Sequence, residues 1–363
     1  MDTETLSSGR LNVTNVVTST TSRILVAGGG GFIGHHLVRR LKATGAWVRG
    51  VDLKIPVFES SPADEFLTLD LRNYEACSAA VKDIDEVYQL AADMGGIGYI
   101  TAVHADLARN NVLINSHMLE ASRRSSVKRY LFSSSACVYP GYRQSKPERG
   151  GLKESDAIPA DPEPGYGWEK LFSEQLTTYF GKESGLITRI ARFHNIYGPL
   201  GTFEGGREKA PAAISRKVAE TPDGGTVTVW GDGRQTRSFC YVSDCVEGLI
   251  RIMKSDYSGP LNLGSEESVT VRELVELVCD VAGKHLNFVY DKTQPQGVRG
   301  RNSDNRLLRE TVGWEPQTSL RAGVEQTYPW IWKLLDRLGR AKPPSRAPSL
   351  QQLQVRTPQS SPS

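Results

Sequence analysis

A glycine-rich turn between an apolar strand and a helix constrains the fold of this chain more than any other feature. The apolar run Arg23–Ala27 predicts a strand, and the pattern HHLVRRLK after the glycines predicts a helix that ends before Gly45. Such glycines allow a tight turn and a close approach of backbone to a pyrophosphate, which the helix N-terminus attracts. The residues expected to form this dinucleotide site are Gly28, Gly31, Phe32, Ile33 and Gly34. A glycine-rich connection without a ligand is the alternative.

Carboxylates at the ends of the next predicted strands indicate which dinucleotide binds. Asp52 closes the second strand, where a carboxylate accepts hydrogen bonds from ribose hydroxyls and repels a 2′-phosphate, so NAD is favoured over NADP. The other interpretation of Asp52 is a solvated carboxylate at a strand end. Asp70 closes the third strand and could contact the adenine. Ala92 follows the fourth strand, where a small residue lets the cofactor lie close.

The alternation of strands and helices from residue 23 onward determines the fold class. Such repeats imply a parallel sheet with helices on both faces and a ligand at the carboxyl ends of the strands. We therefore expect an α/β protein, with a Rossmann-type doubly wound parallel sheet and a smaller α/β substrate-binding domain. The expected boundaries are 23–192 with a return of about 237–260 for the NAD-binding domain, 193–236 and 261–338 for the substrate-binding domain, and 1–22 and 339–363 for disordered tails.

Acid–base chemistry is predicted at the end of a later strand. The apolar run 127–132 is followed directly by small polar residues that include Ser135. Tyr166 and Lys170 stand at i and i+4, which places both side chains on one face of a helix. The Lys170 ammonium should lower the pKa of the Tyr166 phenol from its ordinary value of about 10, and the Ser135 hydroxyl could share the proton. We expect this trio to remove a proton from an alcohol while a hydride leaves its carbon.

Composition and charge argue against several classes of protein. The chain has 363 residues and a net charge of +3, with no basic run interleaved with aromatic residues, so a nucleic-acid groove is not indicated. No apolar run approaches the roughly 20 residues of a membrane span. The five cysteines form no CxxC pair and no Cys/His ligand spacing, which favours reduced thiols in the cytoplasm over a metal site. The acid-poor amino end could instead be the remnant of an organelle address.

A glycine-rich segment and separate arginines indicate a site for a diphosphate. The segment 193–211 either has no role or wraps a ligand, and its Arg, Lys and Asn residues favour the second interpretation. Arg237 lies in a following loop and Arg301 in a later one. Guanidinium groups match phosphate oxygens bidentately, so arginines from separate loops would suit a sugar nucleotide. The common alternative is that each of them is a surface arginine in a salt bridge.

A resemblance to a known family rests on the glycine turn, the Ser/Tyr/Lys trio and the segment GDGRQTRSFCYVSD. These features resemble the extended short-chain dehydrogenase/reductase family of nucleotide-sugar epimerases and dehydratases, over about residues 23–332. Within it, AADMGGIG, SSACVYP and GGREKAPAA are similar to the members that act on GDP-mannose. The resemblance implies catalytic NAD, GDP-mannose or a related sugar nucleotide as substrate, and inversion at sugar carbons 3 and 5 through a transient ketone at carbon 4.

The same resemblance implies roles for further residues. Inversion needs one group on each face of the sugar ring, and Cys137 and Lys209 are the matching pair, with the thiolate as base and the ammonium as acid. The positions that match substrate contacts are Gly95, Ser135, Asn195, Lys209, Lys217, Arg237 and Arg301. Taken alone, a cysteine after a strand is usually a small core residue and Lys209 would be a loop charge. Both assignments therefore depend on the resemblance.

Other functions and a partner stay open at this point. A nucleotide-sugar 4-epimerase would need only the Ser/Tyr/Lys trio, a nucleotide-sugar dehydratase is a further alternative, and a non-catalytic NAD-binding scaffold would need only the fold. The helices expected over about 101–124 and 166–184 are those through which relatives dimerise, so we expect a homodimer. Their amphipathic faces are equally consistent with packing inside one chain.

Overall fold

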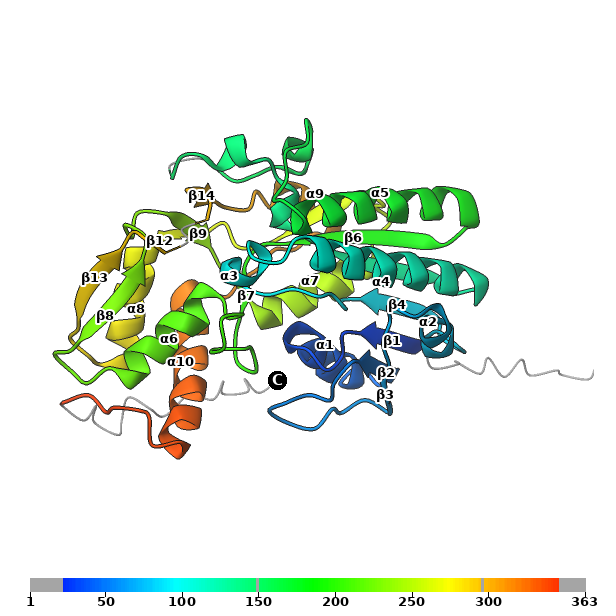
Figure 1. Ribbon diagram of the computed structural model, residues 1–363. Helices are drawn as coiled ribbons and strands as arrows, with labels where there is room; N and C mark the ends of the chain where they lie inside the picture. The colour runs from blue at the N-terminus through cyan, green and yellow to red at the C-terminus, as the bar shows by residue number, and fades with distance from the viewer. Residues whose placement is uncertain (1–21, 148–149, 295–296, 346–363) are drawn as a thin grey trace, which may run out of the picture.

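The computed structural model describes residues 22–345 except 148–149 and 295–296, so most of the two expected tails lies outside the described residues. Its largest element is a seven-stranded sheet in the order β11-β6-β5-β4-β1-β2-β3 (Figure 1). The strands in chain order are β1 (Arg23–Ala27), β2 (Trp47–Asp52), β3 (Glu65–Thr68), β4 (Glu86–Gln89), β5 (Arg129–Ser135), β6 (Ile187–Phe193) and β11 (Pro260–Leu263). Every neighbouring pair is parallel, and the order reverses between β1 and β4. This confirms the doubly wound Rossmann-type sheet.

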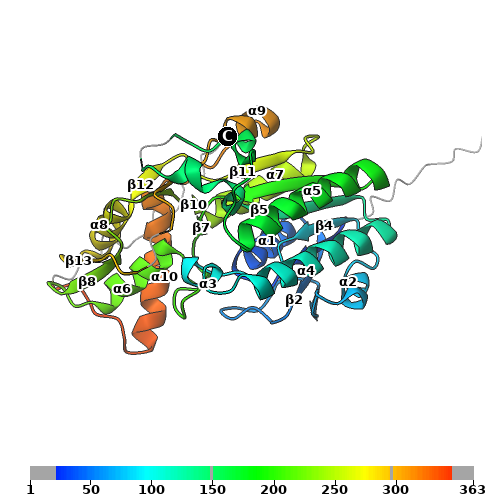
Figure 2. The same cartoon turned by 45° about the horizontal axis from the view of Figure 1, so that its top comes forward.

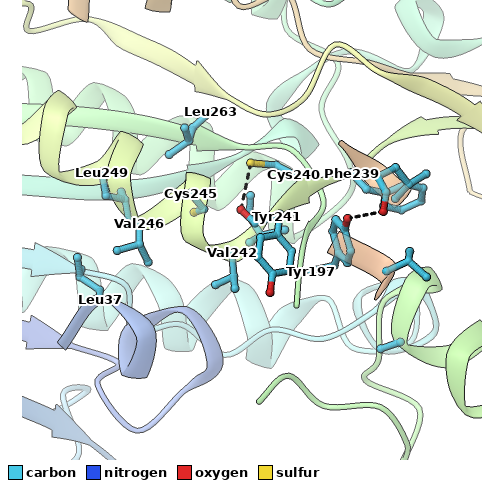
Figure 3. Close-up of a cluster of buried hydrophobic side chains, with 14 of the residues drawn as sticks. Leu37, Tyr197, Phe239, Cys240, Tyr241, Val242, Cys245, Val246, Leu249 and Leu263 are labelled. Atoms are coloured by element: carbon cyan, nitrogen blue, oxygen red, sulfur yellow. Dashed lines mark hydrogen bonds between the residues drawn. The ribbon is translucent and has the colours of Figure 1, made fainter. Parts of the chain in front are cut away.

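Side chains that alternate along the strands of the large sheet belong to two hydrophobic layers, one on each face of the sheet. Ile24 and Val26 of β1 belong to a cluster with side chains from the helices at residues 32–42 and 242–254. Leu25 and Ala27 point the other way and belong to a cluster with side chains from the helices at residues 74–80 and 105–124. The covering helices are α1 (Phe32–Lys42), α2 (Tyr74–Ala80), α4 (Ala105–Arg124), α5 (Tyr166–Ser184) and α7 (Val242–Lys254). Figures 1 and 2 show α4 and α5 side by side, and Figure 3 shows Leu37 of α1 near side chains of α7. Helices on both faces thus bury the strands, as a parallel sheet requires.

A smaller α/β part lies beside the large sheet (Figure 1). Its two sheets have the strand orders β12-β9-β14 and β13-β8, and the short strands β7 and β10 pair with each other. These strands are β7 (Ile196–Tyr197), β8 (Thr226–Trp230), β9 (Thr236–Ser238), β10 (Cys240–Tyr241), β12 (Ser268–Thr270), β13 (Asn287–Asp291) and β14 (Gly300–Arg301). The remaining helices are α3 (Ile97–Ile100), α6 (Ala210–Glu220), α8 (Val271–Ala282), α9 (Arg306–Val312) and α10 (Leu320–Arg337), with 3-10 helices at Ala136–Val138, Gly141–Gln144 and Glu154–Ala157. Helix α10 packs against α6 and α8, which confirms a smaller α/β part.

The return of the chain to the large sheet ends later than the sequence predicts. Strand β11 pairs in parallel with β6, and its residues Leu261 and Leu263 are fully buried. The backbone of this short strand covers the edge of β6, so the chain leaves the sheet after Leu263, three residues beyond the end expected at about 260.

The carboxyl-terminal tail begins later than the sequence predicts. The sequence predicts a disordered tail from residue 339 onward, but Arg340 forms ion pairs with Glu204 at 2.8 Å and with Glu220 of α6. The N–H of Lys342 also donates to the Ala219 carbonyl at 2.8 Å. These contacts dock the segment on α6, which composition alone does not reveal because its Pro and Ser content resembles that of the rest of the tail.

The five cysteines are all buried and unpaired. Within residues 22–345 and outside the two internal gaps, none of the helices is long and apolar enough to cross a membrane. The same described residues hold no group of three or more His, Cys, Asp or Glu side chains arranged to bind a metal ion.

Candidate active site

The turn between β1 and α1 has the geometry that a dinucleotide needs. Gly28 has a φ of +82°, and a Cβ atom there would lie 2.9 Å from the backbone nitrogen of Ala91, so a side chain does not fit. The Gly31 N–H donates to the Gly28 carbonyl at 3.0 Å and closes the turn. The first turn of α1 is formed by Phe32, Ile33 and Gly34. Backbone N–H groups and the helix dipole therefore attract an anion at this point.

Asp52 lies beside this turn at the carboxyl end of β2. Its Oδ2 atom accepts a hydrogen bond from the Gly30 N–H at 3.1 Å, and burial raises the pKa of the carboxyl. A Cβ atom on Gly30 would lie 2.2 Å from the Lys54 carbonyl oxygen, so the turn and the end of β2 are in direct backbone contact. The adjoining pocket is lined by Gly31, Phe32, Lys54, Phe58 and Leu200, among others. A carboxylate in this place fits the ribose of NAD.

Asp70 and Ala92 follow the next two strands toward the same edge of the sheet. Asp70 forms a bidentate ion pair with Arg72, with 2.6 Å between Arg72 Nη2 and Asp70 Oδ2, and this hydrogen bonding lowers the pKa of Asp70. Ala92 comes directly after Ala91, whose backbone borders Gly28. The residues around the glycine turn thus fit NAD, whereas a contact between Asp70 and the adenine stays a prediction.

Ser135, Tyr166 and Lys170 meet at the carboxyl end of β5. The strand extends through Ser135, beyond the end predicted at residue 132, because the serines pair with β6. Tyr166 begins α5, is buried, and shares a hydrogen bond with the Ser135 hydroxyl. The Lys170 Nζ atom lies 5.5 Å from the centre of the Tyr166 ring and donates to the Ser133 carbonyl at 3.1 Å. The i, i+4 spacing therefore places both side chains on the face of α5 that meets β5.

The electrostatics of Tyr166 differ from the sequence-based prediction. Burial raises the pKa of its phenol well above the ordinary value, Cys137 and Glu169 raise it further, and the hydrogen bond with Ser135 lowers it. The Glu169 carboxylate lies 3.7 Å from Lys170 Nζ, with both side chains about 1% exposed, so a negative charge faces the ammonium. The predicted fall in the pKa of Tyr166 is therefore wrong for this chain, because the prediction took no account of burial or of Glu169.

Cys137 lies just beyond Ser135, in a hydrophobic cluster that includes Tyr166. It is 7% exposed, and its N–H donates to Ser135 Oγ at 3.2 Å. Its sulfur accepts a hydrogen bond from Arg301 Nη1 at 3.5 Å, while Arg301 Nε donates to Gln144 Oε1 at 2.5 Å. Gln144 and the thiol thus hold the guanidinium between them, which fixes a positive charge directly beside the sulfur.

Lys209 stands immediately before α6 and belongs to the same group of side chains. Burial lowers the pKa of its ammonium, Cys137 raises it, and the charge of Arg301 lowers it. These interactions bring Lys209 and Cys137 into one cluster although they are far apart in the sequence. A lysine whose pKa is lowered releases a proton more readily at a pH nearer neutrality, which is the property of a general acid.

Arg237 and Asn195 flank this cluster on the side of the smaller part. Arg237 lies next to Arg301 because β9 and β14 pair in parallel, and burial with the charges of Arg301 and Arg299 lowers its pKa to about 9. Asn195 has a φ of +44°, and its side-chain amide donates to the Ser238 carbonyl at 3.0 Å. Arg237 and Arg301 therefore form a pair of guanidinium groups beside Cys137, and Asn195 fixes the carboxyl end of β9.

Lys217 and Gly95 complete the residues predicted from the sequence. The Lys217 ammonium donates to the Thr228 carbonyl of β8 at 2.8 Å, which binds it to the neighbouring small sheet. Gly95 is buried, and a Cβ atom there would lie 2.8 Å from the Tyr99 Cβ and 3.1 Å from the Arg207 Cγ. Gly95 thus lies where the loop after β4 meets the segment before Lys209.

Sequence reasoning missed two residues that hold this site in place, Gln144 and Glu169, and it read Arg207 only as part of the ligand-wrapping segment 193–211. Gln144 orients Arg301, Glu169 lies beside Lys170, and Arg207 contacts the loop that holds Gly95. Glu169 had a usable signal, since a charged residue next to Lys170 on a buried helix must find a partner. Gln144 ends a short 3-10 helix and Arg207 lies in a loop, and no sequence pattern predicted the contacts of either residue.

Comparisons with known proteins agree with this geometry. Residues 24–264 match the NAD dependent epimerase/dehydratase family. The chain is 45% identical over 317 residues to a GDP-mannose 3,5-epimerase of Arabidopsis thaliana, which covers 87% of this chain and 83% of the relative. It is 31% identical to UDP-glucuronic acid decarboxylase 1 of the same plant, with 83% of this chain and 68% of the relative covered.

Solved structures show the same fold. The UDP-glucose 4-epimerase of Thermotoga maritima with UDP-glucose has a TM-score of 0.77 at 26% identity, and it covers 86% of this chain and 99% of that chain. The UDP-glucose 4-epimerase of Thermus thermophilus in complex with NAD has a TM-score of 0.75 at 25% identity, with 85% and 98% covered. The family match, the sequence identity and the glycine turn lead to one conclusion: this chain belongs to the NAD dependent epimerase/dehydratase family.

Proposed function

We propose that this chain inverts carbons 3 and 5 of GDP-mannose through a transient ketone at carbon 4, giving GDP-L-galactose, with GDP-L-gulose as a side product. The observation that carries the proposal is that Cys137 packs in one cluster with Tyr166 of the Ser/Tyr/Lys trio, while the charge of Cys137 also acts on Lys209. A simple 4-epimerase needs only the trio. The 45% identity to a GDP-mannose 3,5-epimerase of Arabidopsis thaliana supports the same substrate.

The trio is placed to act on the hydroxyl at carbon 4. Bound NAD supplies an acceptor for the hydride of that carbon and later a donor of the same hydride. Tyr166 acts as the phenolate: it takes the hydroxyl proton and becomes the phenol, and Ser135, which is hydrogen-bonded to it, shares that proton. Lys170 is fixed by the Ser133 carbonyl and keeps its ammonium near the phenol. Loss of the proton and the hydride leaves a ketone at carbon 4, and their return restores the alcohol.

Cys137 and Lys209 then change the configuration of the neighbouring carbons. A ketone at carbon 4 acidifies the C–H bonds at carbons 3 and 5. The Cys137 thiolate removes one such proton, and the electron pair moves into an enolate. The Lys209 ammonium, whose pKa burial lowers, delivers a proton to the opposite face of the same carbon. Each inversion therefore consumes one proton and releases one.

The paired arginines suit the diphosphate of the substrate. Arg237 and Arg301 occupy equivalent positions on the parallel strands β9 and β14. Two adjacent guanidinium groups repel each other, and an anion between them relieves this repulsion and accepts bidentate hydrogen bonds. The lowered pKa of Arg237, at about 9, reflects burial together with that repulsion. We assign the diphosphate to this pair, with Asn195 and Lys217 as further contacts from the smaller part.

Exchange with deuterated solvent tests the proposal. Protein with its bound NAD and GDP-mannose in deuterated water should place deuterium at carbons 3 and 5, which NMR detects. Cys137→Ala should abolish this exchange and still allow oxidation at carbon 4. Protium retained at both carbons with the unaltered protein would reject the proposal. A sugar inverted only at carbon 4, with Cys137→Ala as active as the unaltered protein, would show a 4-epimerase.

We further infer that the protein is a cytoplasmic homodimer. Trp168, Phe172 and Tyr179 are 52%, 51% and 51% exposed and form one stripe along α5, which fits the same stripe of a second copy. Buried free cysteines suit a reducing compartment. Light scattering during gel filtration should give the mass of a dimer, and Trp168→Glu should give a monomer. A monomeric unaltered protein would contradict the dimer.

A further inference from the structure

Three side chains clasp two loops together beside the site. The Arg207 guanidinium lies 3.8 Å from the centre of the Tyr99 ring, and its Nη1 atom donates to the Met94 carbonyl at 3.4 Å. The same Nη1 atom lies 3.8 Å from Asp93 Oδ1, which accepts a hydrogen bond from the Tyr99 hydroxyl at 2.8 Å. Asp93, Tyr99 and Arg207 therefore form a closed set of contacts, named here the Arg207 clasp.

The clasp also fixes the backbone that leads to Lys209. The Gly96 N–H donates to the Arg207 carbonyl at 3.0 Å, and a Cβ atom on Gly96 would lie 2.6 Å from the Glu208 carbonyl oxygen. The two loops are thus in backbone contact at the residues directly before Lys209. In Figure 2, α3, which follows Gly96, lies close to α6, which begins after Lys209.

The two glycines directly before Arg207 give the backbone conformational freedom and do not hold it in place. Gly205 and Gly206 have φ of +87° and +82°, a region that favours glycine. A Cβ atom at either position would meet nothing within 4 Å, so these glycines are required by backbone conformation and not by crowding. Gly205 and Gly206 by themselves therefore do not restrict Lys209 to one position.

The far end of the clasp is tied to the helix of the Ser/Tyr/Lys trio. Asn111 accepts a hydrogen bond from the Asp93 N–H at 2.6 Å and donates one to the Asp93 carbonyl at 2.9 Å. The same Asn111 amide donates to Glu169 Oε1 at 2.9 Å, and Glu169 lies 3.7 Å from Lys170 Nζ. A continuous series of contacts therefore joins Lys170 to Arg207.

We propose that Arg207 is a positioning residue for proton transfer, which holds Lys209 opposite Cys137 by closing the clasp over Tyr99 and Asp93. This inference rests on the proposed function. Through Asn111 and Glu169, the position of the acid is set by the same helix that sets the position of Tyr166, so oxidation and inversion act on one orientation of the sugar. A misplacement of about 1 Å lowers a rate on the order of 100-fold, which makes such a fixed reference necessary.

Arg207→Ala in the NAD-bound, full-length protein tests the clasp. Its matched control is Arg251→Ala on helix α7, which is remote from the clasp. This change also removes a guanidinium that lies over an aromatic ring, 5.5 Å from the centre of the Trp314 ring. The two arginines are 50% and 41% exposed. Arg207→Ala should lower kcat for deuterium exchange from GDP-mannose on the order of 10- to 100-fold, with KM and the absorbance of reduced NAD unchanged. Arg251→Ala should change neither.

Variants of Tyr99 separate positioning from a general loss of structure. Tyr99→Phe keeps the ring under the guanidinium and should retain most of the exchange rate, whereas Tyr99→Leu should match Arg207→Ala. Unchanged exchange in Arg207→Ala would overturn the clasp and leave the proposed function intact. A raised KM with unchanged kcat would also overturn it, because Arg207 would then bind substrate directly. Absence of exchange in the unaltered protein would overturn both proposals.

Discussion

The two sides of the site are built in opposite ways. On the cofactor side the backbone decides: Gly28 excludes a side chain, and Asp52 is bound to a glycine N–H. On the side of proton transfer the site depends on side chains from separate segments: Arg301 of a short strand contacts Cys137 of a 3-10 helix, and the charges of both act on Lys209 at the start of α6. One added atom should therefore break the first side, whereas the second should keep its fold and lose only its chemistry when a side chain is altered.

The largest effect is expected from single changes that separate oxidation from inversion. Tyr166→Phe should abolish both the reduction of bound NAD and deuterium exchange, because the base at carbon 4 is lost. Lys209→Met should leave NAD reduction intact and lower double inversion on the order of 10²- to 10⁴-fold, the usual contribution of a general acid. Absorbance of reduced NAD and NMR of the sugar measure the two steps. Equal loss of NAD reduction in both variants would show that the two sides are not separable.

Gly28→Ala should break the cofactor side as a unit. The alanine must adopt a φ near +82° and place its Cβ atom 2.9 Å from the Ala91 nitrogen, so both strain and overlap oppose it. Together they should cost about 2–5 kcal/mol of unfolding free energy. Thermal unfolding and the NAD content of the purified protein measure this. Gly205→Ala is the matched control, because it has a similar φ of +87° but open space, and it should cost less and leave NAD bound. Similar losses in both would show that crowding at Gly28 is unimportant.

The same contrast explains which parts of the molecule the sequence could predict. The glycine turn, Asp52 and the Tyr166/Lys170 spacing are local patterns along strands and helices, and local patterns carry their own geometry. The parallel strands of the large sheet, with helices on both faces, follow from repeated strand-helix units, whose crossovers have one favoured hand. For these features the sequence alone was sufficient, with errors of a few residues at the ends of β5 and of the return segment.

The proton-transfer side could be predicted only through the family resemblance. Cys137 and Lys209 are distant in the sequence, and nothing local connects them. The contacts of Gln144, Glu169 and Arg207 escaped prediction because their partners are set by loops and by burial. The pKa of Tyr166 was predicted in the wrong direction for the same reason, since desolvation depends on the packing around a side chain and not on its spacing.

The pH dependence of exchange should sharpen the account of Lys209. The ammonium must be protonated to deliver a proton, so the rate falls as pH rises through its pKa. Burial lowers that pKa, and the alkaline limit should therefore lie below the ordinary lysine value of about 10.4. Arg301→Gln removes a positive charge that lowers the same pKa, so its limit should move to higher pH. Profiles of kcat at saturating GDP-mannose, with Arg251→Gln as control, measure this shift. A limit that stays in place or moves lower would exclude Lys209 as the acid.

The smallest effects should distinguish two carboxylates on the cofactor side. Asp52→Asn removes a half-buried charge bonded to the Gly30 N–H, and should weaken NAD binding by about tenfold and reduce the preference for NAD over NADP. Asp70→Asn removes an exposed charge paired with Arg72, and should weaken NAD binding by less than about threefold, since such pairs contribute little. Calorimetric titration of protein stripped of NAD measures both. A tenfold loss in Asp70→Asn would place that carboxylate at the adenine, and the cofactor side would then depend on an exposed side chain as well as on its backbone.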